Sequence, residues 1–234
     1  MVERIASRGQ EAGLKPGCGL KAAPHVACET LLGAIMSFEK ELETARRVAV
    51  RAGALALEHQ ARGLRPEDKS DHSPVTQADR ECERLIARLL DESFPADGLL
   101  GEEGAQKSSR SGRRWIIDPI DGTRDFLRGN PCWAVLIALE AGKEAVAGVC
   151  FQPVLNEMFS ASAGSGAYRN GDRIQVSSIT EISRAVLCVT GLNEIAREPY
   201  GQRLVAWMGQ FWAARSMGGS MDAMLVAAGK AEAW

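Results

Sequence analysis

Residues Trp115–Phe126 read WIIDPIDGTRDF, and this stretch decides how the rest of the sequence is interpreted. An apolar run is followed by two aspartates, Asp118 and Asp121, with a proline and an isoleucine between them. The run predicts a buried strand, and the proline together with Gly122 predicts a turn that ends it. Such a turn would direct both carboxylates, and the carbonyl of Ile120, into one space.

The composition excludes several classes of protein. Of 234 residues, 28 are Lys or Arg and 30 are Asp or Glu, so the formal net charge is -2 and nucleic acid is a poor candidate partner. No run approaches the roughly 18 apolar residues that span a membrane, and the N-terminus lacks the apolar segment of a signal peptide. The six cysteines form no C-x-x-C pair, which indicates a reduced, cytoplasmic chain without a disulfide framework or zinc site.

The chain changes character at Met36. Residues 1–35 show weak periodicity, and we expect a disordered or over-called leader, with a short ordered extension as the alternative. From Met36 to about Gln60, apolar residues recur every three or four positions, which predicts an amphipathic helix with Ser37 as its N-cap. A second helix is predicted from about Thr76, with the buried face Cys82, Leu85, Ile86, Leu89 and Leu90.

The middle of the chain is rich in β-formers. WIID, CWAVLIALE, AVAGVCF and EMFSAS predict successive antiparallel strands, and Asn170-Gly171 predicts a hairpin. KSSRSGRR, residues 107–114, is interpreted as a polar, mobile loop. After Ser177, two strands (AVLCVT and FWAARS) alternate with helices near 199–208 and 221–228. We therefore expect an N-terminal α+β part over 36–176 and a smaller α/β part over 177–234.

Three acidic clusters suit a hard cation such as Mg²⁺, which prefers oxygen ligands. They are Asp79, the pair Glu102-Glu103, and Asp118 with Asp121. Together they could hold two ions about 3.5–4 Å apart. Each cluster alone has an ordinary explanation: a helix capping box over residues 76–79, a solvated loop, and a strand-ending turn.

Here the sequence resembles the inositol monophosphatase superfamily of magnesium-dependent phosphatases, from about Met36 to Trp234. The matching motifs are DPIDGT at 118–123, GEE at 101–103 and KSDHSPVTQAD at 69–79. The resemblance implies hydrolysis of a phosphate monoester by metal-activated water, a homodimer, and two or three Mg²⁺ ions. It implies a layered α-β-α-β-α sandwich with an antiparallel N-terminal sheet and an incomplete C-terminal α/β half.

The resemblance also implies a role for each matching residue. The metal ligands would be Glu102, Asp118, Asp121 and the carbonyl of Ile120, and the pair that activates water would be Asp79 and Thr123. Backbone N–H groups of Gly122 and Thr123 would bind phosphate. Lys69 is a phosphate ligand or a solvated lysine, and Glu103 would orient the site; on the leaving-group side we expect segments 190–197 and 215–220, with Asn193, Glu194, Arg215 and Ser220.

The sequence departs from the family pattern near its end. Family members carry a further metal aspartate in a Trp-Asp dipeptide, and the printed chain stops before it, at Trp234. Asp222 does not replace that aspartate, because it falls in the first turn of a predicted helix, where an acid is favoured by the helix dipole. We expect this form to bind its second ion weakly and to turn over slowly.

The substrate is a small phosphorylated metabolite, and the motifs leave its identity open. RGNPCWAVLIALE, residues 128–140, resembles the histidinol-phosphatase branch, which favours histidinol phosphate over inositol monophosphate. Two other classes stay open: a non-catalytic phosphate- or metal-binding member of the same fold, and an ordinary globular domain with acidic turns.

Overall fold

The computed structural model describes residues 37–63, 67–68, 74–75 and 77–234. The expected leader, Lys69 and the predicted cap Thr76 lie outside the described residues. The chain divides into two units, Met1–Ile35 and Met36–Trp234, and only the second is described here. The further division near residue 177 stays a prediction.

Two long helices open the second unit. Helix α1 (Glu39–Arg62) buries residues spaced as the sequence predicts, including Leu42, Ala45 and Ala49. Its N-cap is Phe38 rather than Ser37, and no side chain caps it, so the predicted cap is wrong by one residue. In α2 (Gln77–Ser93) the fully buried apolar residues of the predicted face are Cys82, Ile86 and Leu90.

An eight-stranded sheet follows, in the order β10-β9-β8-β7-β6-β5-β3-β4. All neighbours are antiparallel except β3 and β5, which are parallel. The strands are β3 (Gly98–Gly101), β4 (Gln106–Lys107), β5 (Arg113–Asp121), β6 (Ala134–Ala141), β7 (Glu144–Gln152), β8 (Glu157–Ser162), β9 (Gly166–Arg169) and β10 (Asp172–Ile174). A separate antiparallel pair joins β1 (Glu67–Asp68) to β2 (Pro74–Val75).

The local signals for strands and turns are largely confirmed. The predicted hairpin lies between β9 and β10, where Asn170 and Gly171 have φ values of 51° and 91°, as a tight turn with two left-handed residues requires. The predicted mobile loop at 107–114 is wrong at both ends. Lys107 pairs within β4, and residues 113–114 begin β5, because neighbouring strands supply hydrogen-bond partners that composition does not reveal.

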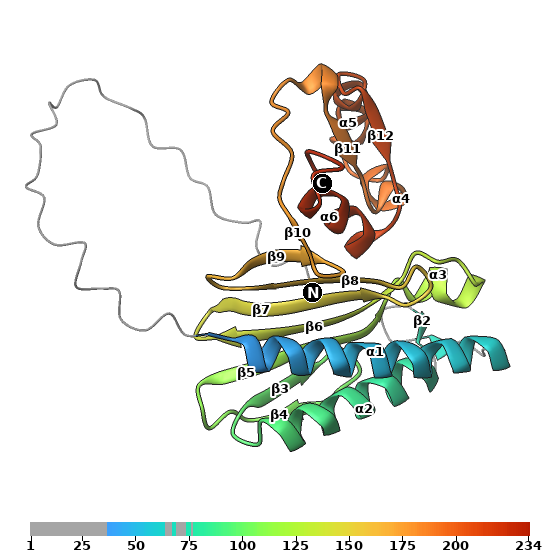
Figure 1. Ribbon diagram of the computed structural model, residues 1–234. Helices are drawn as coiled ribbons and strands as arrows, with labels where there is room; N and C mark the ends of the chain where they lie inside the picture. The colour runs from blue at the N-terminus through green and yellow to red at the C-terminus, as the bar shows by residue number, and fades with distance from the viewer. Residues whose placement is uncertain (1–36, 64–66, 69–73, 76) are drawn as a thin grey trace, which may run out of the picture. The chain divides into compact units, whose positions relative to one another are not determined.

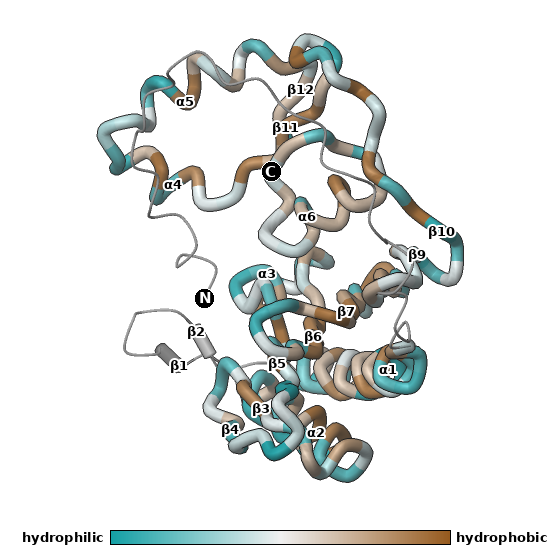
Figure 2. Tube along the Cα trace, turned by 90° about the vertical axis from the view of Figure 1, so that its left-hand side faces the viewer, coloured by the Kyte–Doolittle hydropathy of each residue, from teal (hydrophilic) through white to brown (hydrophobic). Residues whose placement is uncertain are grey.

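Helices α1 and α2 lie side by side on one face of this sheet (Figure 1). Their buried residues join Trp115, Ile117, Phe126 and Trp133 in the main apolar core. The hydrophobic colour is strong on β6 and β7, the central strands (Figure 2). On the opposite face a smaller cluster, Ala134, Cys150 and Phe159, packs with Met224 and Ala228 of the C-terminal part.

The C-terminal part alternates strands and helices as predicted. Strand β11 (Val186–Cys188) pairs in parallel with β12 (Ala213–Arg215), and Ala233 bridges in parallel to Leu187 of β11. The helical elements are α3 (Thr123–Arg128), η2 (Ile182–Arg184), α4 (Leu192–Ile195), α5 (Gly201–Met208) and α6 (Gly219–Ala227). The architecture is thus mixed α/β, with a largely antiparallel sheet and a small parallel one. In the part of the chain that the structure describes, no helix is long and apolar enough to span a membrane.

A buried carboxylate ties the start of β5 to the core. Asp97 is 2% exposed and accepts hydrogen bonds from the Arg113 guanidinium (3.1 and 2.9 Å), Trp115 Nε1 (3.1 Å) and Ser111 Oγ (2.7 Å). Arg113 also donates to Glu41 of α1 at 2.8 Å. A buried charge is tolerated only when it is paired and hydrogen-bonded, so this cluster depends on all of its members.

Replacing Arg113 with alanine should destabilise the protein by about 3–5 kcal/mol, because it leaves the buried Asp97 without its counter-charge. The neighbouring Arg114→Ala is a matched control. Arg114 is 47% exposed in its ion pair with Glu140, so its loss should cost less than about 1 kcal/mol. Urea unfolding of both variants measures the difference, and equal losses would contradict this account.

Candidate active site

A bulge in β5 brings the two aspartates of the motif onto one face of the sheet. Asp118 pairs with Leu136 and Asp121 with Ala134, so the register shifts between them. Before the bulge, the buried side chains Trp115 and Ile117 are two residues apart, as in a regular strand. The next buried isoleucine, Ile120, comes three residues later, which agrees with one extra residue in the strand. Without the extra residue, positions 118 and 121 would point to opposite faces. The prediction is therefore wrong at Pro119, where the strand continues through a bulge to Asp121, and right at Gly122, where the chain turns into α3.

Glu102 reaches the same region from the neighbouring parallel strand. It follows β3 directly, and its backbone N–H donates to the Ile117 carbonyl at 3.1 Å. Burial, followed by the charges of Glu102 and Asp121, raises the pKa of Asp118 well above its ordinary value. The charges of Glu102 and Asp121 thus act on Asp118, and their role as metal ligands stays a prediction.

Glu83 holds the acidic turn in place, and the sequence analysis did not single it out. This side chain of α2 is 3% exposed, and its carboxylate accepts the backbone N–H groups of Glu103 and Ala105, each at 2.7 Å. A Cβ at Gly101 would lie 2.3 Å from that carboxylate, so glycine is required there. Glu83 follows Asp79 by one helical turn on the buried face, a spacing that could have identified it.

The predicted water-activating pair is also brought together. Asp79, 2% exposed, lies in the first turn of α2. Thr123 Oγ1 lies 3.5 Å from Asp79 Oδ1 and 3.2 Å from the carbonyl oxygen of Ile120. A hydroxyl has one proton, so Thr123 can donate to only one of these acceptors at a time.

Gly122 makes the change of direction between β5 and α3. It caps α3 with φ 92° and ψ 37°, in the left-handed region. A Cβ there would lie 2.7 Å from the carbonyl oxygen of Cys132. Both the backbone conformation and the packing therefore require glycine, which places Thr123 at the start of α3.

Of the residues expected on the leaving-group side, Ser220 contacts the proposed site, whereas Arg215, Asn193 and Glu194 are exposed. The backbone N–H of Ser220, in α6, donates to Asp121 Oδ2 at 3.0 Å, so Ser220 adjoins the site. Arg215 is exposed in β12, and its guanidinium donates to the Ala214 carbonyl at 2.8 Å. Asn193 and Glu194 are exposed in α4.

The donor set suits a magnesium-type cation in its chemistry. Every candidate ligand is a carboxylate or carbonyl oxygen, as Mg²⁺ prefers. Asp118 Oδ1 is buried and accepts no hydrogen bond from the described residues, and such an oxygen needs a donor or a cation. Among those same residues, no three His, Cys, Asp or Glu side chains are arranged to hold an ion as they stand.

The chain was compared with known proteins. The sequence profile of the inositol monophosphatase family matches residues 38–234. A histidinol-phosphatase of Chlorobaculum parvum is 41% identical over 193 residues, which are 82% of this chain and 74% of that protein. An inositol-1-monophosphatase of Rhizobium meliloti is 41% identical over 161 residues, 67% of this chain and 60% of that protein. The chain belongs to the inositol monophosphatase family.

Solved structures agree with this assignment. The extragenic suppressor protein suhB from Bartonella henselae superimposes with a TM-score of 0.75 at 31% identity, covering 82% of this chain and 76% of that one. An IMPase from Thermotoga maritima gives a TM-score of 0.75 at 30% identity, covering 82% and 74%. The fold described above is thus the fold of these two structures.

Gly122→Ala should destabilise the protein more than Gly129→Ala, its matched control. Both glycines flank α3 in the left-handed conformation, but a Cβ at Gly129 meets nothing within 4 Å. We expect a loss of about 1–2 kcal/mol at Gly129 from the conformation alone, and roughly 1–3 kcal/mol more at Gly122 from the clash with Cys132. Urea midpoints test this ranking. Equal midpoints would show that the loop at Cys132 can shift to make room for the Cβ at little cost in stability.

Proposed function

We propose that this protein hydrolyses a small phosphate monoester, using Mg²⁺ bound by Glu102, Asp118, Asp121 and the Ile120 carbonyl. The observation that carries the proposal is the buried Oδ1 of Asp118, to which no described residue donates a hydrogen bond and on whose carboxyl the charges of Glu102 and Asp121 act. Family membership supports the same reaction class. When bound, the ions supply charge neutralisation and a water of lowered pKa.

The protein's own groups orient the attacking water. Thr123 lies between Asp79 and the Ile120 carbonyl. When its proton is donated to Asp79, the hydroxyl oxygen keeps its lone pairs for a hydrogen of the water. Asp79 therefore fixes the direction of the Thr123 hydroxyl, and Thr123 positions the water for in-line attack on phosphorus.

The phosphate site is proposed at the start of α3. The first N–H groups of a helix have no acceptor within the helix, so those of Gly122 and Thr123 suit phosphate oxygens. The Ser220 N–H binds Asp121, so Ser220 adjoins the proposed site, and its contact with the leaving group stays a prediction. A contribution from Lys69 or Arg215 stays a prediction.

Within the reaction class we propose histidinol phosphate as the substrate. The relatives named histidinol-phosphatase, from Chlorobaculum parvum and Mycobacterium tuberculosis, match over 193 and 186 residues at 41% and 40% identity. The inositol-1-monophosphatase of Rhizobium meliloti reaches the same identity over a shorter stretch of 161 residues. The longer match supports the histidinol-phosphatase type, as does the resemblance of segment 128–140 to that branch.

Measuring phosphate release from a panel of monoesters tests this proposal. We expect histidinol phosphate to be hydrolysed faster than inositol 1-phosphate, and chelation by EDTA to abolish both reactions. Thr123→Ala should lower kcat by roughly 10²–10⁴-fold, the range for loss of a proton-transfer partner, while Arg114→Ala leaves it unchanged.

Other outcomes discriminate the alternatives. Faster hydrolysis of inositol 1-phosphate would overturn the substrate and keep the reaction class. Stabilisation by Mg²⁺ without turnover of any ester would favour the non-catalytic, metal-binding member of the fold.

A further inference from the structure

Asp222 is a fully buried carboxylate outside the proposed ligand set. It lies in the first turn of α6, as the sequence predicts, but it is 0% exposed. Its Oδ2 accepts from Thr190 Oγ1 at 2.9 Å, and its Oδ1 accepts from the Met217 backbone N–H at 3.0 Å. Attraction to the helix dipole does not require burial, and burying a charge is costly. The two hydrogen bonds therefore indicate a more specific role.

The hydrogen bonds continue from Asp222 to the last residue of the chain. Trp234 Nε1 donates to Thr190 Oγ1 at 3.1 Å. Because the Thr190 oxygen accepts from Trp234, its own proton is directed to Asp222. Trp234 in turn is held beside β11, where the Cys188 N–H donates to the Ala233 carbonyl at 2.9 Å. The segment after β11, the start of α6 and the residues after α6 thus meet at one carboxylate.

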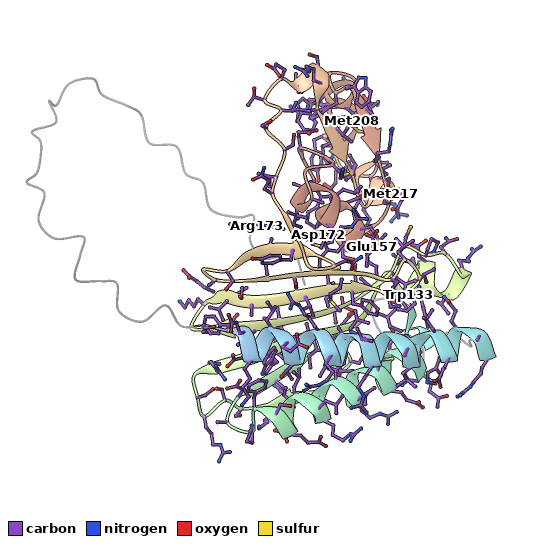
Figure 3. The ribbon with its side chains drawn as sticks, viewed as in Figure 1. Trp133, Glu157, Asp172, Arg173, Met208 and Met217 are labelled. Atoms are coloured by element: carbon purple, nitrogen blue, oxygen red, sulfur yellow. The ribbon has the colours of Figure 1, made fainter. Side chains whose placement is uncertain are left out.

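This network controls the bend that leads into α6. Met217 lies between β12 and α6 (Figure 3). Gly218 follows it with φ 111°, and its carbonyl accepts the Asp222 N–H at 2.9 Å. Asp222 therefore holds the bend from both sides: its carboxylate binds Met217, and its backbone closes the first turn of the helix.

The same bend sets the position of the amide that meets Asp121. Ser220 lies two residues after Gly218, and its N–H donates to Asp121 Oδ2 at 3.0 Å. The bend also adjoins the loop that packs on Gly122, because a Cβ at Gly218 would lie 3.9 Å from the Cys132 carbonyl oxygen. A shift at Asp222 would consequently reach both segments around Asp121.

We propose that Asp222, oriented by Thr190, is a positioning residue: it fixes the first turn of α6 so that the Ser220 N–H holds the carboxylate of Asp121 at its metal-binding angle. The part that concerns the metal rests on the proposed function. The part that concerns the Ser220–Asp121 hydrogen bond does not. An ordinary cap would stabilise α6 without affecting Asp121.

Asp222→Asn is the central variant, because it keeps the shape, removes the charge and leaves one acceptor oxygen for two donors, the Thr190 hydroxyl and the Met217 N–H. Amide hydrogen exchange of Ser220, resolved by NMR without added metal, should accelerate at least roughly tenfold, while amides of the central strand β6 exchange as in wild type. Isothermal titration with Mg²⁺ should show affinity weakened about 10–100-fold, as for other residues that orient metal ligands. Asp172→Asn, an exposed aspartate of β10, is the control and should change neither quantity.

A matched pair at Thr190 keeps the test decisive if Asp222→Asn does not fold. Thr190 is exposed, so its variants spare the core. Thr190→Val removes only the hydroxyl and should reproduce both effects more weakly. Thr190→Ser keeps the hydroxyl and should behave as wild type.

Wild-type exchange of Ser220 in the variants that lack the hydrogen bonds would overturn the positioning role. Faster exchange with unchanged Mg²⁺ affinity would reduce Asp222 to a cap of α6 and overturn it as well. A wild-type protein that binds no Mg²⁺ would instead refute the proposed function, and the exchange data would still decide whether Asp222 positions Ser220.

Discussion

Mutual repulsion between the buried carboxyl of Asp118 and its neighbours Glu102 and Asp121 is the constraint on which the rest of this site depends. Burial already opposes ionisation of Asp118, and the charges of Glu102 and Asp121 add to that opposition. Such groups converge only where the backbone forces them together, since isolated side chains would turn toward water. Three features impose this arrangement: the bulge in β5, the parallel pairing of β3 with β5, and the hydrogen bond from the Ser220 amide to Asp121. On the proposed function, a bound cation would supply the charge that makes the arrangement favourable.

Two of the proposed ligands are held through contacts with residues that are distant in sequence, and the sequence alone does not show these contacts. Glu102 depends on Glu83 through the turn after β3, and Asp121 depends on α6. By contrast, the hairpin at 170–171 and most helices and strands were predicted correctly, because periodicity and short motifs are local properties. Glu83 and Asp222 differ from ordinary surface acids only in the strand or loop that packs against them, and one sequence does not show that packing. Asp97 escaped notice for the same reason.

The wrong predictions share this origin. Pro119 indicated a turn, yet proline also suits a bulge, where its missing N–H removes no regular ladder bond. The polar stretch 107–114 indicated a mobile loop, yet its arginine at 113 is fixed by Asp97 and Glu41. In both cases the local pattern was compatible with two structures, and long-range hydrogen bonds selected the less obvious one. Of the expected five-layer sandwich, the described elements establish the coarser part: a mixed α/β fold with one large, largely antiparallel sheet and a small parallel one.

Thr123 shows how the geometry can join metal binding to water activation. Its single proton has two acceptors, the Ile120 carbonyl at 3.2 Å and Asp79 at 3.5 Å. The shorter distance favours the carbonyl while that oxygen has no other partner. A carbonyl that serves a cation accepts hydrogen bonds less well, which leaves Asp79 as the better acceptor. The hydroxyl would then turn its lone pairs toward the water only when the ligand oxygen of Ile120 is occupied. On the proposed function, the bulge would therefore do more than gather ligands, because it places the Ile120 carbonyl within reach of Thr123, the residue proposed to orient the attacking water.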